Sequence, residues 1–117
     1  MATYEKRILS GSTNGKAIKV AAVATAGTLI HTAVAGTSDI DEIWIYAQNT
    51  STSSVTLDIE WGGVAAPDDL IELTVLPEAG LVTVIAGLPL QNGLVVRAFA
   101  GTTNVITITG FVNRITA

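Results

Sequence analysis

The stretch SVTLDIEW, residues 54–61, indicates the fold class of this chain most clearly. Apolar and polar residues alternate along it: Val55, Leu57, Ile59 and Trp61 against Ser54, Thr56, Asp58 and Glu60. Successive side chains of a strand point to opposite faces, so a period of two predicts a half-buried antiparallel strand. We therefore expect Asp58 and Glu60 to lie on a solvated face or at a polar contact between subunits. A two-carboxylate hydrolytic site is the weaker interpretation of this pair.

The preceding segment IDEIWIYAQN, residues 40–49, has two apolar faces. Ile43, Ile45 and Ala47 share one face, and Trp44 and Tyr46 share the other. Such a strand lies either in the centre of the fold or at a contact between subunits. Trp44 and Tyr46 therefore fill a second layer of the core or anchor an interface, and the pattern leaves both readings open.

Further strands follow on both sides of this pair, and the linker of residues 49–54 is too short for a crossover helix. We expect them over residues 6–11, 16–26, 27–34, 69–76, 80–87, 93–101 and 104–115. The pairs Asn14-Gly15 and Asn92-Gly93 predict tight turns, because both residue types tolerate positive φ. Eight or nine strands at this spacing predict a single antiparallel β-sandwich or jelly-roll-like domain over residues 8–117. Residues 1–7 are expected to form a polar N-terminal arm.

The composition agrees with a β-rich protein whose surface carries few charges. Thr, Val and Ile make up about a third of the 117 residues, and such β-branched side chains suit a pleated sheet. Only 14% of the residues are charged, against about 25% in an average soluble domain. The surface is therefore expected to be rich in Thr, Ser and Gly or covered by other subunits.

Charge and cysteine content exclude several classes of function. The net charge is −4 and the six cationic residues are scattered, which argues against a nucleic-acid partner. Without cysteine there is neither a disulfide nor a thiolate metal site. No apolar run reaches about 18 residues, so no membrane span is expected. The N-terminus lacks the apolar stretch of a signal peptide, and we expect synthesis and folding in the cytoplasm.

The stretch WGGVAAPDDLIEL, residues 61–73, gathers three carboxylates that could suggest a metal or acid–base site. Pro67 favours the start of a turn, and aspartates stabilise turns through their own backbone. In a strand that begins near residue 69, Asp69 and Glu72 point to opposite faces. We therefore interpret Asp68 and Asp69 as turn residues and expect no metal ion.

His31 is the only histidine, so any Ser-His-Asp mechanism would depend on it. Ser10 and Ser38 lie in no nucleophile elbow, and a zinc site would need further histidine or cysteine ligands. We expect a structural histidine, no cofactor and no enzymatic activity.

Four segments carry a resemblance to a known group of proteins: DEIWIYAQN (41–49), LDIEWGG with APDDLIEL (57–73), LQNGLVVRAFA (90–100) and GFVNRI (110–115). In their order, over residues 6–115, they resemble small structural proteins of tailed-bacteriophage virions. The resemblance implies an all-β capsid decoration or cement protein that binds the major capsid protein or other virion proteins. It also implies a homo-oligomer, with a trimer favoured, located on the virion after synthesis in the host cytoplasm. It brings no catalytic residues.

Tyr4, Trp44 and Tyr46 are the residues we expect at an interface, together with the N-terminal arm. One alternative places the chain in the tail, the collar or a head fibre. A second is a carbohydrate-binding module in which Trp44, Tyr46 or Trp61 stacks on a sugar ring.

Overall fold

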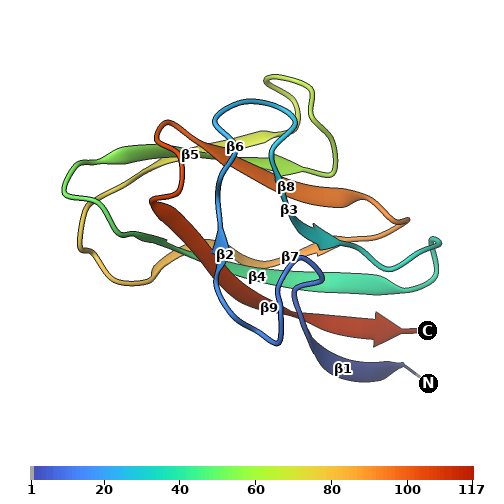
Figure 1. Ribbon diagram of the computed structural model, residues 1–117. Coiled ribbons are helices and arrows are strands. Elements are labelled where there is room, and N and C mark those ends of the chain that lie inside the picture. Colours follow the sequence, from blue (N-terminus) through green and yellow to red (C-terminus); the bar gives the residue numbers. More distant parts are fainter. Residues whose placement is uncertain (1) are drawn as a thin grey trace.

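The fold is all-β, as the alternation predicts. The computed structural model describes residues 2–117 and contains nine strands in two packed sheets, with no helix in that range (Figure 1). The strands are β1 (Thr3–Ile8), β2 (Ile18–Lys19), β3 (Thr28–Thr32), β4 (Ile40–Asn49), β5 (Val55–Trp61), β6 (Leu70–Val75), β7 (Val82–Leu90), β8 (Val95–Ala100) and β9 (Ile106–Thr116). The predicted single β-sandwich is confirmed.

The strand order is that of a jelly roll. The first sheet has the order β1-β9-β4-β7, with β2 also paired to β9, and the second has the order β3-β8-β5-β6. The antiparallel pair β5–β6 is nested in the chain inside β4–β7, then inside β3–β8, and finally inside β1–β9. One long hairpin is thus folded over into two layers, which is the double-sheet jelly-roll arrangement.

The core lies between the two sheets and uses the inward residues that the alternation predicts. Ile43 and Ile45 of the first sheet are fully buried, as are Leu57 and Ile59 of the second. Alternate positions of β4 therefore face outward, and this places Trp44 on the outer face of the first sheet.

The strand expected over residues 16–26 is largely wrong, because only Ile18–Lys19 forms β2. The segment from Val20 to Gly27 instead crosses from the first sheet to the second, held by bonds such as Ala100 N–H to Ala22 O at 3.0 Å. Its four alanines offer little apolar surface for a sheet to bury. Gly27 also approaches β8 so closely that a Cβ would lie 2.5 Å from the Ala98 carbonyl oxygen.

Both predicted Asn-Gly turns are confirmed by their backbone conformation. Asn92 and Gly93 have φ values of 63° and 67°, and Asn14 and Gly15 have 55° and 86°. Each turn is closed by a hydrogen bond, from the Leu94 N–H to the Gln91 carbonyl at 3.3 Å and from the Lys16 N–H to the Thr13 carbonyl at 3.0 Å. The strands that flank each turn do not pair with each other, so neither turn forms a hairpin.

The N-terminal segment runs along β9 in a regular register, from Thr3 opposite Thr116 to Ile8 opposite Phe111. The two chain ends therefore lie close together (Figure 1). The role of residues 1–7 as a partner-binding arm stays a prediction, and Met1 is outside the described residues. Within residues 2–117 no helix is long and apolar enough to cross a membrane.

Candidate functional site

A row of four residues crosses the outer face of the first sheet, one from each neighbouring strand. Lys6 of β1 places its Nζ 4.7 Å from the centre of the Phe111 ring on β9. The Phe111 and Trp44 rings stack with centroids 5.8 Å apart and planes 11° from parallel. The benzenoid ring of Trp44 lies against Gly87 of β7, where a Cβ would be 3.0 Å from Cζ2. The rings are therefore fixed in place by their neighbours.

Hydrogen bonds to Glu42 further fix the position of Trp44 in this row. The Trp44 indole N–H donates to Glu42 Oε1 at 3.3 Å, and Asn113 Nδ2 donates to the same oxygen at 3.2 Å. Tyr46 follows on β4, half-buried and opposite Thr109. Trp44, Tyr46 and Phe111 are thus all partly exposed on this face.

The three predicted interface residues all lie on the first sheet. Trp44 and Tyr46 are half-buried on its outer face, outside the core, which excludes the reading in which they fill the sandwich interior. Tyr4 of β1 is 72% exposed and opposite Ile115 of β9. Their role in an interface stays a prediction.

The same geometry bears on the carbohydrate alternative. One face of Trp44 is turned to Phe111, which leaves less of the ring for a sugar to stack on. Trp61 belongs to β5 of the second sheet and packs against the core. The three rings named for that alternative therefore do not form one platform.

His31 of β3 belongs to a buried polar cluster that also includes residues on the inner face of the first sheet. Its Nε2 lies 2.8 Å from Asp41 Oδ2, and both side chains are almost completely buried. Arg114 donates from Nε to Asp41 Oδ1 at 2.7 Å and from Nη2 to Oδ2 at 2.9 Å. The Val34 N–H donates to the same carboxylate at 3.1 Å. This satisfied network joins β3, β4 and β9.

Ser10, His31 and Asp41 are near one another, as in a catalytic triad, but their atoms are differently connected. The Ser10 backbone N–H donates to His31 Nδ1 at 3.0 Å, and the Ser10 hydroxyl oxygen accepts from the Thr32 N–H at 2.7 Å. Nδ1 is therefore an acceptor, and the proton sits on Nε2, facing Asp41. Neither ring nitrogen is free to take a proton from a serine hydroxyl, as that mechanism requires.

The protonation of this cluster follows from its burial and charges. Desolvation lowers the pKa of His31, outweighing the opposite effect of Asp41, so the ring stays neutral. Burial alone would raise the pKa of Asp41, but hydrogen bonds from Arg114 and His31 bring it below its usual value. The Asp41 carboxylate correspondingly raises the pKa of Arg114. Sequence reasoning missed Asp41 and Arg114. The one available signal was that Asp41 has the inward parity of Ile43.

Asp58 and Glu60 are buried, so the expected solvated face is wrong. Only 6% of Asp58 and none of Glu60 is exposed. The crossing segment covers Glu60, which accepts from the Thr25 hydroxyl at 2.5 Å and from the Gly27 N–H at 2.6 Å. A cover supplied by a segment more than 30 residues away cannot be predicted from alternation alone.

Asp58 pairs with Glu72 across β5 and β6 and is incompletely satisfied. Its Oδ1 has no hydrogen-bond partner among residues 2–117. Desolvation, followed by the hydrogen bond to Glu72 and the charges of Glu72 and Glu60, raises the pKa of Asp58 to about 6. Asp58 is therefore protonated in mildly acidic solution.

The predicted turn at Pro67, Asp68 and Asp69 is confirmed. Asp69 Oδ2 accepts from the Ala65 N–H at 3.0 Å, while the Asp69 N–H donates to the Ala65 carbonyl at 2.9 Å. Asp68 is exposed and Glu72 lies with Asp58, so the three carboxylates diverge. Within residues 2–117 no three or more His, Asp or Glu side chains gather closely enough to hold a metal ion.

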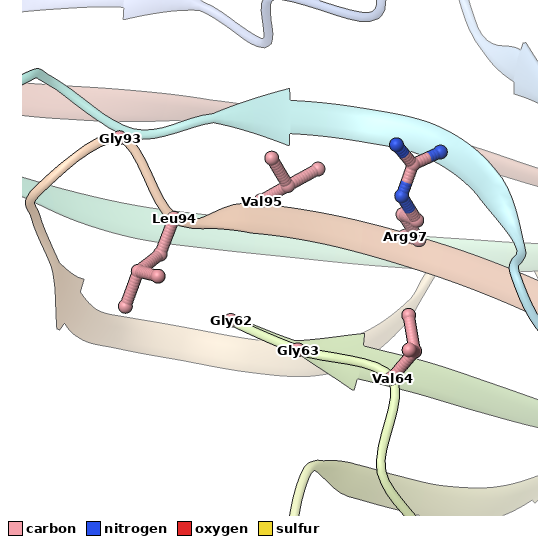
Figure 2. Close-up of a pocket in the computed structure, with 7 residues that line it drawn as sticks. All are labelled: Gly62, Gly63, Val64, Gly93, Leu94, Val95 and Arg97. Atoms are coloured by element: carbon pink, nitrogen blue, oxygen red, sulfur yellow. The ribbon is translucent and has the colours of Figure 1, made fainter.

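An open cavity of about 230 Å³ lies beside the ends of β5 and β8 (Figure 2). Its lining residues are Gly62, Gly63, Val64, Gly93, Leu94, Val95 and Arg97. Arg97 is the only charged one, and its Nη1 donates to the Gly27 carbonyl at 3.2 Å. Ligand pockets commonly measure about 300–1,000 Å³ and combine several convergent polar groups. This cavity provides one guanidinium between apolar walls and glycine backbone.

Comparisons with protein-family models, curated proteins and solved structures give no match to this chain.

Proposed function

We propose that this chain is a structural protein of a tailed-phage virion, a capsid decoration or cement protein that stabilises the head from outside. The observation that carries the proposal is the aromatic face, which we define as the outer surface of the first sheet around Trp44, Tyr46 and Phe111. It concentrates rigid, half-exposed rings in a protein with only 5% aromatic residues. Such rings are typical anchors of protein interfaces.

Two further arguments support the proposal. Jelly rolls are common in viral capsid proteins, although they also occur in lectins and cupins, so the fold alone gives no function. The resemblance of residues 6–115 to small virion proteins selects among these classes. Both ring nitrogens of the buried His31 are already hydrogen-bonded, so His31 is not available as the base of a Ser-His-Asp mechanism.

The mechanism is burial of apolar surface at junctions between capsid subunits. Each Å² removed from water contributes about 25 cal/mol, and the contribution is repeated in every symmetric copy. Rings that are already fixed by Glu42, Gly87 and Phe111 lose little conformational freedom on binding. The aromatic face therefore suits binding without rearrangement.

Heating particles that carry or lack the protein tests this function. We expect particles without it to release their genome at a lower temperature, and expect adding the purified protein to restore the original temperature. Equal heat resistance and identical particle composition would contradict the proposal.

A matched pair of variants tests the contact face. Tyr46→Ala removes a half-buried ring from the aromatic face, whereas Leu29→Ala removes an exposed apolar side chain from the second sheet. We expect Tyr46→Ala to reduce binding to particles by about tenfold or more and Leu29→Ala to leave it nearly unchanged. Equal losses would show that another face makes the contact.

Electron microscopy of labelled particles separates the head from the tail, collar and head-fibre locations. Label found only at the tail would move the proposal there. A glycan array separates both locations from the carbohydrate alternative, because a hit abolished by Tyr46→Ala would favour sugar binding instead.

A further inference from the structure

Strand β1 is a free edge of the first sheet. It pairs with β9 on one side, and all six of its residues are exposed, so neither face of the strand is covered. Tyr4 and Ile8 are 72% and 49% exposed. An exposed edge of this length offers unpaired N–H and C=O groups to another strand.

The other three sheet edges are less suited to pairing. Strand β7 contains Gly87 and Pro89 and has two register shifts against β4, and β3 has one shift against β8. Strand β6 is regular, but only two of its six residues are exposed, against all six of β1. Strand β1 has neither proline nor glycine and keeps one register along β9.

We propose that β1 pairs antiparallel with β1 of a second copy of this chain, around a twofold axis at Lys6. In this register Tyr4 lies opposite the partner subunit's Ile8, and Glu5 lies opposite the partner subunit's Arg7. Each contact occurs twice because a twofold interface repeats itself. Two exposed apolar pairs and two opposite-charge pairs thus form across the strands.

Neighbouring registers lack this complementarity. An axis at Glu5 sets two glutamates against each other and Tyr4 against the partner's Lys6. An axis at Arg7 sets two arginines together and Lys6 against the partner's Ile8. Each of the three axes sets two like charges opposite each other, but only the axis at Lys6 adds two opposite-charge pairs and two apolar pairs, so the order Tyr-Glu-Lys-Arg-Ile favours that axis.

Charged residues on an edge strand commonly prevent pairing. In the proposed register one contact between like charges remains. The two Lys6 residues meet at the axis, but each Nζ is directed to its own Phe111 ring, 4.7 Å from the centroid. Glu5 and Arg7 already form an ion pair of 2.5 Å within one chain. In the dimer these four groups form one alternating cluster.

The pairing joins the two first sheets into one continuous sheet. The expected species in solution is a dimer, whereas the resemblance to virion proteins implies a trimer. A contact of six residues per chain is far smaller than the interface of a stable complex, which usually has about 20–30 residues on each side. We therefore expect a weak dimer that forms as concentration rises and weakens as salt rises. This inference holds or fails in solution, independently of the virion proposal.

A charge-swap experiment with the full-length chain tests it. The readout is mass from sedimentation or light scattering over a concentration series. Arg7→Glu replaces both attractive pairs by repulsion and should weaken dimerisation by about tenfold or more. Glu5→Arg should do the same, whereas the double variant Glu5→Arg/Arg7→Glu should dimerise like the original. Mixing the two single variants should give a heterodimer, since positions 5 and 7 are then both positive in one β1 and both negative in the other.

Lys16→Glu is the control, because Lys16 is exposed and lies outside β1; it should leave dimerisation unchanged. Circular dichroism confirms that each variant is folded, and the mixing experiment remains decisive if one variant is less stable. A monomer at every concentration, a trimer, or a dimer that Arg7→Glu leaves intact would each overturn the proposal.

Discussion

At the scale of single residues, the sandwich contains more buried charge than its sequence suggests. Asp41 is fully buried and accepts hydrogen bonds from His31, Arg114 and the Val34 N–H. A buried ion pair is costly to desolvate, but removing one partner is costlier because the other charge is then uncompensated. This cluster therefore fixes how β3, β4 and β9 meet.

Asp41→Asn should destabilise the protein by about 3 kcal/mol, because Arg114 then keeps its charge without a carboxylate partner. Urea unfolding followed by circular dichroism measures the loss. Asp68→Asn is the control: Asp68 is exposed, and a surface change of this kind stays within about 0.5 kcal/mol. Equal effects of the two variants would show that the cluster contributes nothing.

Asp58→Asn should stabilise the protein at pH 7.5, on the order of 2 kcal/mol, and have little effect near pH 3.5. The pKa of Asp58 is raised to about 6 in the folded protein, from an ordinary 3.8. Between these values the folded state holds a proton that the unfolded state has lost, so stability falls as pH rises. Asparagine removes that dependence.

Unfolding free energies at several pH values between 3.5 and 7.5 provide the test, with Asp68→Asn again as the control. A loss of stability in Asp58→Asn at pH 7.5 would show that the carboxylate is well accommodated as a charge.

At the scale of strands, the aromatic row depends on a glycine. Gly87 has φ +76°, and a Cβ there would lie 3.0 Å from Trp44 Cζ2 and 3.3 Å from Cε2. An added side chain must therefore displace the indole, which is also stacked on Phe111.

Gly87→Ala should destabilise the protein by about 1 kcal/mol more than Gly80→Ala. Gly80 has a similar φ of +72° but no neighbouring atom within 4 Å of the added Cβ, so the pair shares the backbone strain and differs in the Trp44 contact. Thermal or urea unfolding measures the difference. Equal losses would mean that Trp44 moves without cost.

The local patterns predicted the strands well, and long-range contacts account for the errors. Alternation placed Ile43 and Ile59 inward and Trp44 on the face opposite Ile43, since parity within a strand is a local property. It failed at Glu60, where the segment of residues 20–27 covers a polar face. Alanine-rich residues 16–26 also gave a false strand, because alternation alone does not show that a sheet has room for them.

The candidate site was predictable only in part. Tyr46 and Trp44 were identified because two aromatics share one strand face. Phe111 and Gly87 complete the row from β9 and β7, and only the register of the first sheet brings them beside Trp44. Arg114 meets Asp41 across 73 residues of chain, a separation that no local motif spans.

At the scale of the whole molecule, nested antiparallel pairing explains both its stability and its open surfaces. The pairs from β5–β6 out to β1–β9 close one core, and the last pair leaves β1 as an edge. The aromatic face and this edge belong to the same sheet. Binding to a capsid and pairing between copies would thus use adjacent parts of one surface.

A cryo-electron microscopy reconstruction of intact particles tests the structural role most directly. The account predicts density for this sandwich on the outside of the head, repeated with the capsid symmetry, with Trp44 and Tyr46 turned toward the shell. Purified particles that contain no copy of the chain, or copies whose aromatic face points into solvent, would contradict it.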